Sequence, residues 1–143
     1  MYLTYEEYSD MGGTLDEAAF TDLEFEARAY IDWVTFDRLK NEDEEAIPES
    51  VKECMYHIIR IVQNKLEAMN VGVGTATAES SKYGAGIASQ SNDGVSISYN
   101  TLSARDIIET SEAQVNQAIR RYLSGVKNTL GHRLLYRGLY ADE

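Results

Sequence analysis

"PESVKECMYHIIRIVQNKLEAM", residues 48–69, predicts the central helix of the fold. Its apolar side chains recur three and four positions apart, so they share one face of an α-helix. Pro48 suits the first turn, where its missing N–H leaves no bond unmade. A helix of this length spans roughly 30 Å at about 1.5 Å per residue, the width of a small domain. The apolar face comprises Val51, Cys54, Met55, Ile58, Ile59, Val62, Leu66 and Met69.

A short helix is expected near the N-terminus. Thr4 and Glu7 have the spacing of a capping box, in which each side chain accepts a hydrogen bond from the other residue's backbone N–H. The glycine pair at 12–13 ends that helix. The charged segment KNEDEEA, residues 40–46, is expected to be a solvated connector to the central helix.

A long helix is expected between these two. Thr14 and Glu17 repeat the capping-box spacing, and apolar residues then recur at helical intervals as far as about Leu39. Aromatic side chains widen the apolar stripe, so we expect this helix to bury more than one face. These side chains are Phe20, Trp33 and Phe36.

A fourth helix is expected from Ala104 to Ser124, where Gly125 ends it. The tail that follows, residues 126–143, is rich in apolar and basic side chains. So many apolar groups are unfavourable in water, and we expect them to pack on this domain or on a neighbouring copy. They are Leu130, Leu134, Leu135, Tyr136, Leu139 and Tyr140.

The region between the third and fourth helices, residues 70–100, is rich in Gly, Ser and Ala. The Asn-Asp-Gly at 92–94 is a tight-turn signal, and Val95, Ile97 and Tyr99 alternate with serine. This pattern predicts a β-hairpin that ends an extended arm. Because a two-stranded hairpin is marginal in water by itself, the arm needs a supporting surface. That surface belongs either to its own helices or to a neighbouring copy.

These elements predict a mainly α fold: a helical bundle of three to four helices with an inserted extended β-hairpin arm and a C-terminal docking tail. The length suits a single domain. Its helical core would comprise residues 1–69 and 101–125, its arm 70–100 and its tail 126–143. No apolar run is long enough for a membrane span, and the N-terminus lacks secretory-signal features. We therefore expect a cytosol-like compartment, unless the protein leaves as part of a larger assembly.

The net charge of −11 is unevenly distributed. Residues 1–50 contain fifteen acidic and three basic side chains, whereas residues 113–141 contain no acidic side chain. Such asymmetry suits head-to-tail contact between copies, or a basic face that meets an acidic partner. For the N-terminal half alone, a merely solubilising surface is the simpler explanation. The basic residues of 113–141 are Arg120, Arg121, Lys127, Arg133 and Arg137.

The sequence contains no recognisable catalytic constellation, so we expect no enzyme, no cofactor and no metal site. The single cysteine, Cys54, lies on the apolar helix face and is expected to be a core thiol rather than a nucleophile. His57 and His132 are far apart and lack motif partners, and His57 is expected at the flank of its helix. The Gly72-x-Gly74 motif lacks the third glycine of a dinucleotide-binding loop.

The basic stretch 120–137, interleaved with Tyr122 and Tyr136, has the composition of a modest nucleic-acid-binding patch. Because tight phosphate binding needs concentrated positive charge, and the whole chain is acidic, we expect DNA to pass without binding tightly. The alternative is that the chain is a small helical DNA-binding or DNA-packaging accessory protein that uses this basic stretch. An enzyme of unrecognised type is a third, weaker possibility.

Segments along nearly the whole chain resemble, in the same order, the head–tail connector (neck adaptor) proteins of tailed phages and prophages of Gram-positive bacteria. The shared patterns consist of structural rather than catalytic residues. The segments are TYEEYSDMGGTLDEAAFTDLEFEARAYIDWVTFDRL (4–39), IPESVKECMYHIIRIV (47–62), DGVSISY (93–99) and LLYRGLY (134–140).

The resemblance implies a structural virion protein with a compact helical domain and a β-arm. Copies would form a ring, typically of twelve, below the portal protein in the virion neck. The ring would extend the DNA channel and dock the next tail-side neck or stopper protein, after assembly in the host cytoplasm. In isolation the chain could be a monomer or a ring.

When the family's interface positions are carried over to this sequence, the resemblance assigns interface roles to the arm and the tail. Because the tail would make the docking contacts, deleting residues 130–143 is expected to leave a folded helical domain and to abolish docking. The arm interface comprises Val95, Ile97 and Tyr99, and the docking tail comprises Arg133, Leu134, Leu135, Tyr136 and Arg137.

Overall fold

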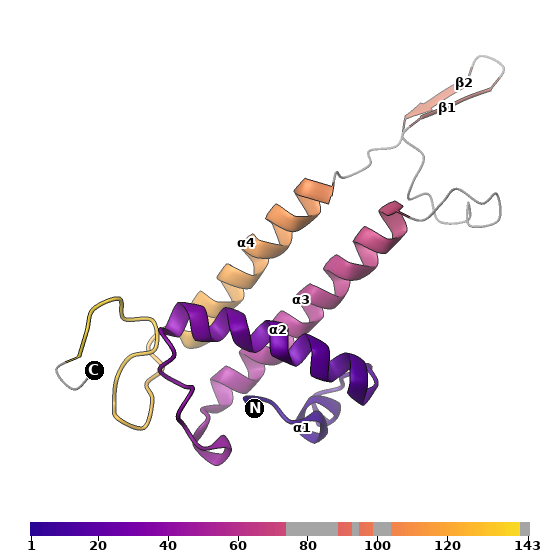
Figure 1. Cartoon of the computed structure of the whole chain (residues 1–143). Helices are drawn as coiled ribbons and strands as arrows, with labels where there is room; N and C mark the ends of the chain where they lie inside the picture. Colours follow the sequence, from indigo (N-terminus) through magenta and orange to yellow (C-terminus); the bar gives the residue numbers. More distant parts are fainter. Residues whose placement is uncertain (74–88, 93–94, 99–103, 141–143) are drawn as a thin grey trace.

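The computed structural model describes residues 1–73, 89–92, 95–98 and 104–140. This part of the chain is mainly helical, which confirms the predicted fold class at that level (Figure 1). The third and fourth helices lie side by side and run in opposite directions, and the second helix packs across them. The helices are α1 (Tyr5–Asp10), α2 (Glu17–Thr35), α3 (Glu49–Val73) and α4 (Ala104–Leu123).

The start of α1 follows the sequence prediction, and the start of α2 does not. At α1, the Glu7 N–H donates to Thr4 Oγ1 at 3.3 Å and the Thr4 N–H donates to Glu7 Oε2 at 2.9 Å. The capping box predicted at Thr14 is wrong. Asp16 caps α2 instead, and its Oδ1 accepts the Ala19 N–H at 2.9 Å. Aspartate caps at least as well as threonine and here stands directly before the first helical residue.

The end of α2 is four residues earlier than expected, at Thr35 rather than Leu39. Phe36 and Asp37 both take left-handed backbone angles, with φ of 56° and 59°, and this turn stops the helix. The Asp37 N–H still donates to the Asp32 carbonyl oxygen at 3.0 Å. The chain therefore changes direction abruptly here, and Phe36 occupies a conformation that glycine adopts more easily.

The connector between α2 and α3 contains a short 3₁₀-helix, η1 (Glu44–Ala46). α3 begins directly after Pro48 and continues to Val73, four residues beyond the predicted end. α4 agrees with the sequence prediction within one residue, and Gly125 follows it with a φ of 85°.

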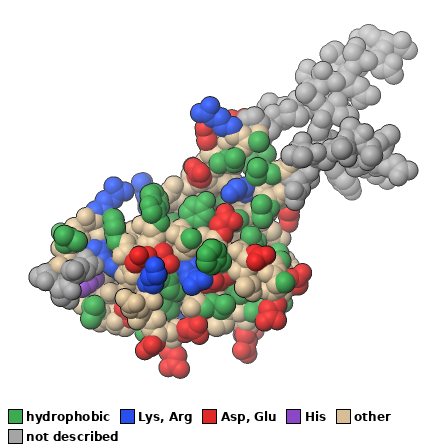
Figure 2. Space-filling model, viewed as in Figure 1, with side chains coloured by type: hydrophobic (Ala, Val, Ile, Leu, Met, Phe, Trp, Pro, Cys, Tyr) green, Lys and Arg blue, Asp and Glu red, His purple; other side chains and the backbone are tan. Residues whose placement is uncertain are grey.

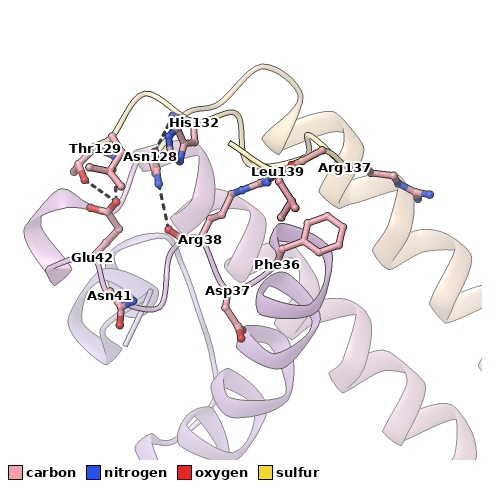
Figure 3. A pocket seen from close by; sticks show the side chains of 12 residues that line it. Phe36, Asp37, Arg38, Asn41, Glu42, Asn128, Thr129, His132, Arg137 and Leu139 are labelled. Atoms are coloured by element: carbon pink, nitrogen blue, oxygen red, sulfur yellow. Dashed lines mark hydrogen bonds between the residues drawn. The ribbon is translucent and has the colours of Figure 1, made fainter. Parts of the chain in front are cut away.

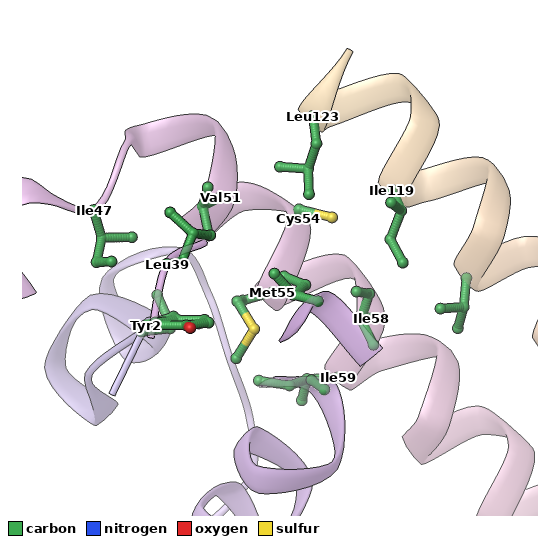
Figure 4. Packing of buried hydrophobic residues seen from close by; sticks show 14 of the residues in the cluster. Tyr2, Leu39, Ile47, Val51, Cys54, Met55, Ile58, Ile59, Ile119 and Leu123 are labelled. Atoms are coloured by element: carbon green, nitrogen blue, oxygen red, sulfur yellow. The ribbon is translucent and has the colours of Figure 1, made fainter. Parts of the chain in front are cut away.

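The core lies where α2, α3 and α4 meet the N-terminal segment (Figure 4). The predicted apolar face of α3 is buried from Val51 to Val62. It leaves the core in the following turn, where Leu66 is 43% exposed. Other buried residues of the core are Tyr2, Leu3, Tyr8, Phe20, Leu23, Ala27, Ile31, Leu39, Ile47, Val115, Ile119, Leu123 and Leu134.

The N-terminal residues are fastened to α2 by polar contacts. The Tyr2 N–H donates to Oε1 of the buried Glu24 at 3.2 Å, and Glu24 also pairs with Arg28. The Tyr2 hydroxyl donates to Asp32 Oδ1 at 2.5 Å. Burial, together with this bond to a carboxylate, raises the pKa of Tyr2.

The tail folds back onto its own domain, which is one of the two arrangements expected from its apolar content. Lys127 and Arg133 form an isolated antiparallel bridge, and the Leu134 N–H donates to the Val126 carbonyl oxygen at 2.9 Å. Leu134 itself is completely buried in the core. The tail is thus part of the folded unit.

Two short strands, β1 (Ser89–Asn92) and β2 (Val95–Ser98), pair in antiparallel fashion with Asn92 opposite Val95. Residues 74–88, 93–94 and 99–100 of the predicted arm, which include its turn and Tyr99, lie outside the described residues, as do residues 101–103. The extended arm therefore stays a prediction.

Candidate interaction surface

The outer side of α2 exposes large aromatic side chains. Trp33 is 75% exposed, Phe25 67% and Phe36 56%, whereas Phe20 is completely buried. The expectation that Trp33 and Phe36 widen the buried stripe is therefore wrong. α2 packs on α3 and contacts α1, and Phe25, Trp33 and Phe36 lie outside these contacts as exposed side chains.

The first hollow at this surface lies between the loop after α2 and the tail, with a volume of about 640 Å³ (Figure 3). Phe36 and Asp37 come from the loop, and Leu130 and Leu139 come from the tail. Leu139 is 88% exposed, the largest exposed fraction among the exposed large apolar residues. Because these two segments are far apart in sequence, only the docked tail creates this hollow.

Arg38 holds the tail in place through its guanidinium group. Nη1 donates to the carbonyl oxygens of Arg133 at 3.2 Å, Leu134 at 3.4 Å and Tyr136, and Nη2 donates to that of Gly138 at 2.8 Å. The planar group of an arginine suits such a cluster of acceptors because its five N–H groups point in fixed directions. Arg38 is largely buried, so these bonds are shielded from water.

Aromatic and polar contacts complete the attachment of the tail. The rings of His132 and Tyr140 stack with centroids 3.9 Å apart and an interplanar angle of 4°. The Arg38 guanidinium lies 5.1 Å from the centroid of the Tyr140 ring. Glu42 Oε1 accepts hydrogen bonds from both the backbone N–H and the hydroxyl of Thr129, at 3.2 and 2.7 Å. His132 therefore has a structural position in this tail.

The second hollow, which we call the aromatic groove, has a volume of about 590 Å³ and lies between α2, α4 and the tail. Phe36 and Arg137 line both hollows, so the two lie next to each other. The groove is also lined by Trp33, Ile119, Arg120 and Leu135.

The charges of the molecule are separated in space as well as in sequence. Figure 2 shows acidic side chains along the lower edge, over η1, α1 and the start of α2. Basic side chains gather at the upper left, over the end of α4 and the tail. Arg120 and Arg137 are exposed and form no ion pair with a described residue.

The predicted docking residues of the tail have different environments. Leu134 is buried and Leu135 is half-buried against the core, so these two hold the tail in place. Arg133, Tyr136 and Arg137 are exposed. The predicted arm residues Val95 and Ile97 lie in β2, and Tyr99 lies outside the described residues.

The titratable groups that sequence analysis singled out are in ordinary structural positions. Burial raises the pKa of the Cys54 thiol to about 12, so the reactive thiolate is scarce at neutral pH. His57 is half-buried at the helix flank, with its ring centroid 5.1 Å from that of Tyr122. Within the described residues, no three His, Cys, Asp or Glu side chains form a group that could hold a metal ion.

Sequence reasoning missed the aromatic groove because Trp33 and Phe36 lie near helical intervals that also fit a buried stripe. One signal could have found it: Phe25, at the interval expected for the solvent face, is also aromatic. Among the described helices, none combines the length and hydropathy that a membrane span requires. Comparisons with protein-family models, curated proteins and solved structures find no match to the chain.

Proposed function

We propose that the chain is a structural adaptor that binds other protein chains, and specifically a head–tail connector of a tailed phage or prophage. The observation that carries this proposal is the exposed surface of Trp33, Phe36 and Leu139, with Arg120 and Arg137 beside it. Small soluble proteins rarely expose contiguous large apolar groups without a partner. Aromatic and arginine side chains are also enriched where proteins bind each other.

In this role, copies form a ring below the portal protein, typically of twelve. The ring extends the DNA channel and docks the next tail-side neck or stopper protein in the virion. Support comes from the order in which residues 4–39, 47–62 and 134–140 resemble connector proteins. The antiparallel register of β1 with β2 is compatible with a hairpin arm that lies on a neighbouring copy.

The tail has two parts in this proposal. Leu134 and the carbonyl groups bound by Arg38 anchor it to its own domain. The exposed Arg133, Tyr136 and Arg137 are the groups that remain available to dock a partner.

The test is the mass of the protein by light scattering, alone and then mixed with its cognate portal protein. We expect a ring-sized species in at least one of these conditions. A strict monomer in both would contradict the connector proposal. Duplex DNA added at about 0.15 M salt should not be retained, because the surface as a whole is acidic.

The exposed arginines at the end of α4 and in the tail favour a DNA-binding accessory protein as the second candidate. Retention of duplex DNA at about 0.15 M salt, lost on charge reversal at Arg120 and Arg121, would support it. Under that alternative, the charge reversal should leave the mass of the protein unchanged.

A further inference from the structure

The aromatic groove combines apolar walls with uncompensated positive charge. Trp33 and Phe36 form its exposed edge, and the largely buried Ile119 lies at its base. Arg120 and Arg137 contribute two positive charges, and none of the residues that line the groove carries a carboxylate. A fitting occupant therefore offers an apolar anchor together with carboxylate groups.

The chain itself carries such a surface, which we call the acidic end, where α1 meets the start of α2. Its carboxylates are exposed and form no ion pair with a described residue. Phe25, 67% exposed, lies one helical turn after Asp22 on α2 and supplies the apolar anchor. The carboxylates are those of Glu6, Asp10, Asp16, Glu17 and Asp22.

The two surfaces lie toward opposite ends of the same helix. Trp33 follows Glu17 by sixteen positions and Phe25 by eight, which is roughly 24 Å and 12 Å along α2 at about 1.5 Å per residue. A rigid helix prevents them from meeting within one molecule. They can meet only between copies, and each such contact leaves one groove and one acidic end free to bind the next copy.

We propose that the aromatic groove of one copy binds the acidic end of a second copy, with Phe25 as the apolar anchor and Asp22 as the carboxylate nearest to it. This inference rests on the proposed function, because it names the contact by which connector copies associate. The contact is head-to-tail, so it produces a closed ring when the rotation between copies closes.

The test uses two variants that each break one side of the contact. The groove variant is Trp33→Ala with Arg120→Glu, and the acidic-end variant is Asp22→Asn with Phe25→Ala, so that the two broken surfaces do not attract each other. All four side chains are exposed, so helicity by circular dichroism and the Tm should stay close to those of the wild type. Light scattering over a concentration series then measures association, alone and with portal protein.

Each variant alone should associate about tenfold more weakly than the wild type, or worse. An equimolar mixture of the two should form a 1:1 heterodimer and nothing larger. The reason is that the intact groove of one variant meets the intact acidic end of the other, and the two broken surfaces then terminate the assembly. Arg121→Glu and Glu53→Lys are matched controls, because both residues are exposed and neither lines the groove. Both controls should associate as the wild type does.

The outcomes separate this contact from the proposed function. If the portal induces a ring of wild-type chains and of both variants alike, the contact is wrong and the connector proposal stands. If only the groove variant fails to bind the portal, the portal is the occupant and the contact is overturned. A mixture that stays monomeric while the wild type assembles also overturns it. If the wild type forms no ring under any condition, both proposals fail.

Discussion

Nη2 of Arg38 donates a hydrogen bond of 2.8 Å to the carbonyl oxygen of Gly138, one hundred positions later in the chain. The same guanidinium also serves carbonyl groups of the preceding tail residues. The exposed side chains of Phe36 and Leu139 lie next to each other beside Arg38 (Figure 3). The shape of the candidate interaction surface therefore depends on one largely buried arginine.

We expect Arg38→Met to lower the free energy of unfolding by about 2–4 kcal/mol, because several carbonyl groups lose charge-assisted hydrogen bonds. Arg38→Lys should restore little of the lost stability, since an ammonium group lacks the planar fork of a guanidinium. Urea unfolding measures the free energy of unfolding of both variants. Lys40→Met is the matched control: its side chain is 63% exposed, and its loss should change stability by less than about 0.5 kcal/mol. Equal stabilities of Arg38→Met and this control would contradict the role of Arg38.

Leu134→Ala should destabilise the whole domain by about 2–4 kcal/mol, the usual effect of truncating a completely buried leucine. Leu130→Ala, at a residue 70% exposed in the same tail, should have almost no effect. Deletion of residues 130–143 should likewise lower thermal stability, contrary to the expectation from sequence that the helical domain is independent of the tail. A deletion variant with the Tm of the wild type would refute this.

Phe36→Asn should raise the free energy of unfolding by about 0.5–1 kcal/mol, because asparagine tolerates the left-handed conformation better than phenylalanine does. The same change removes an exposed ring from the candidate surface, so association between copies should weaken. Asp37→Asn is the matched control, since it lies in the same backbone conformation but keeps the ring. It should raise stability without weakening association. A destabilised Phe36→Asn variant would show that the ring is needed for folding instead.

Glu7 should make folding stability depend on pH in the acidic range. Partial burial opposes its ionisation, but hydrogen bonds from Lys52 and Thr4 more than compensate and hold its pKa below the ordinary value of 4.5. Because the folded-state pKa is the lower one, the stabilising effect is present above about pH 4.5 and is lost as the pH falls through the folded-state value. Glu7→Gln should therefore be less stable than the wild type at neutral pH, with a smaller difference in acid. Denaturant unfolding at several pH values measures this, and a constant difference would contradict it.

The thiol of Cys54 should react with iodoacetamide far more slowly in the native protein than in urea. Burial both blocks access and raises its pKa to about 12, so little thiolate is present near neutral pH. Mass spectrometry over time measures the reaction. The native rate should follow the population of unfolded protein as urea is added. Rapid alkylation of the native protein would instead show an accessible, activated thiol.

The helices of the core could be predicted from the sequence because the signals that start and end them are local. The capping box of Thr4 with Glu7 and the glycine after α4 each act within a few residues, so pattern and structure agree. Asp16 displaced Thr14 as the cap of α2 because two suitable residues stood close together, and only the final backbone conformation selects between them.

The candidate interaction surface could be predicted from the sequence only in part. The basic and apolar residues of the tail can be recognised in the sequence. Which of them are buried and which are exposed depends on tertiary contacts that no local pattern encodes. Leu134 and Tyr136 are two positions apart, yet the first is buried in the core and the second is half exposed. Arg38 binds the carbonyl oxygens of both residues, so the path of the tail backbone over the core decides which of the two side chains is buried.

By itself the sequence determined the mainly helical class, the central helix of residues 48–69, the buried state of Cys54 and the uneven charge. These follow from composition and from periodicities of a few residues, which act before any tertiary contact forms. Only the tertiary structure decided that Trp33 and Phe36 face outward and that the tail belongs to the folded domain. The first outcome depends on how α2 packs against α3, and the second on contacts between residues about one hundred positions apart. Both exist only once the helices have packed.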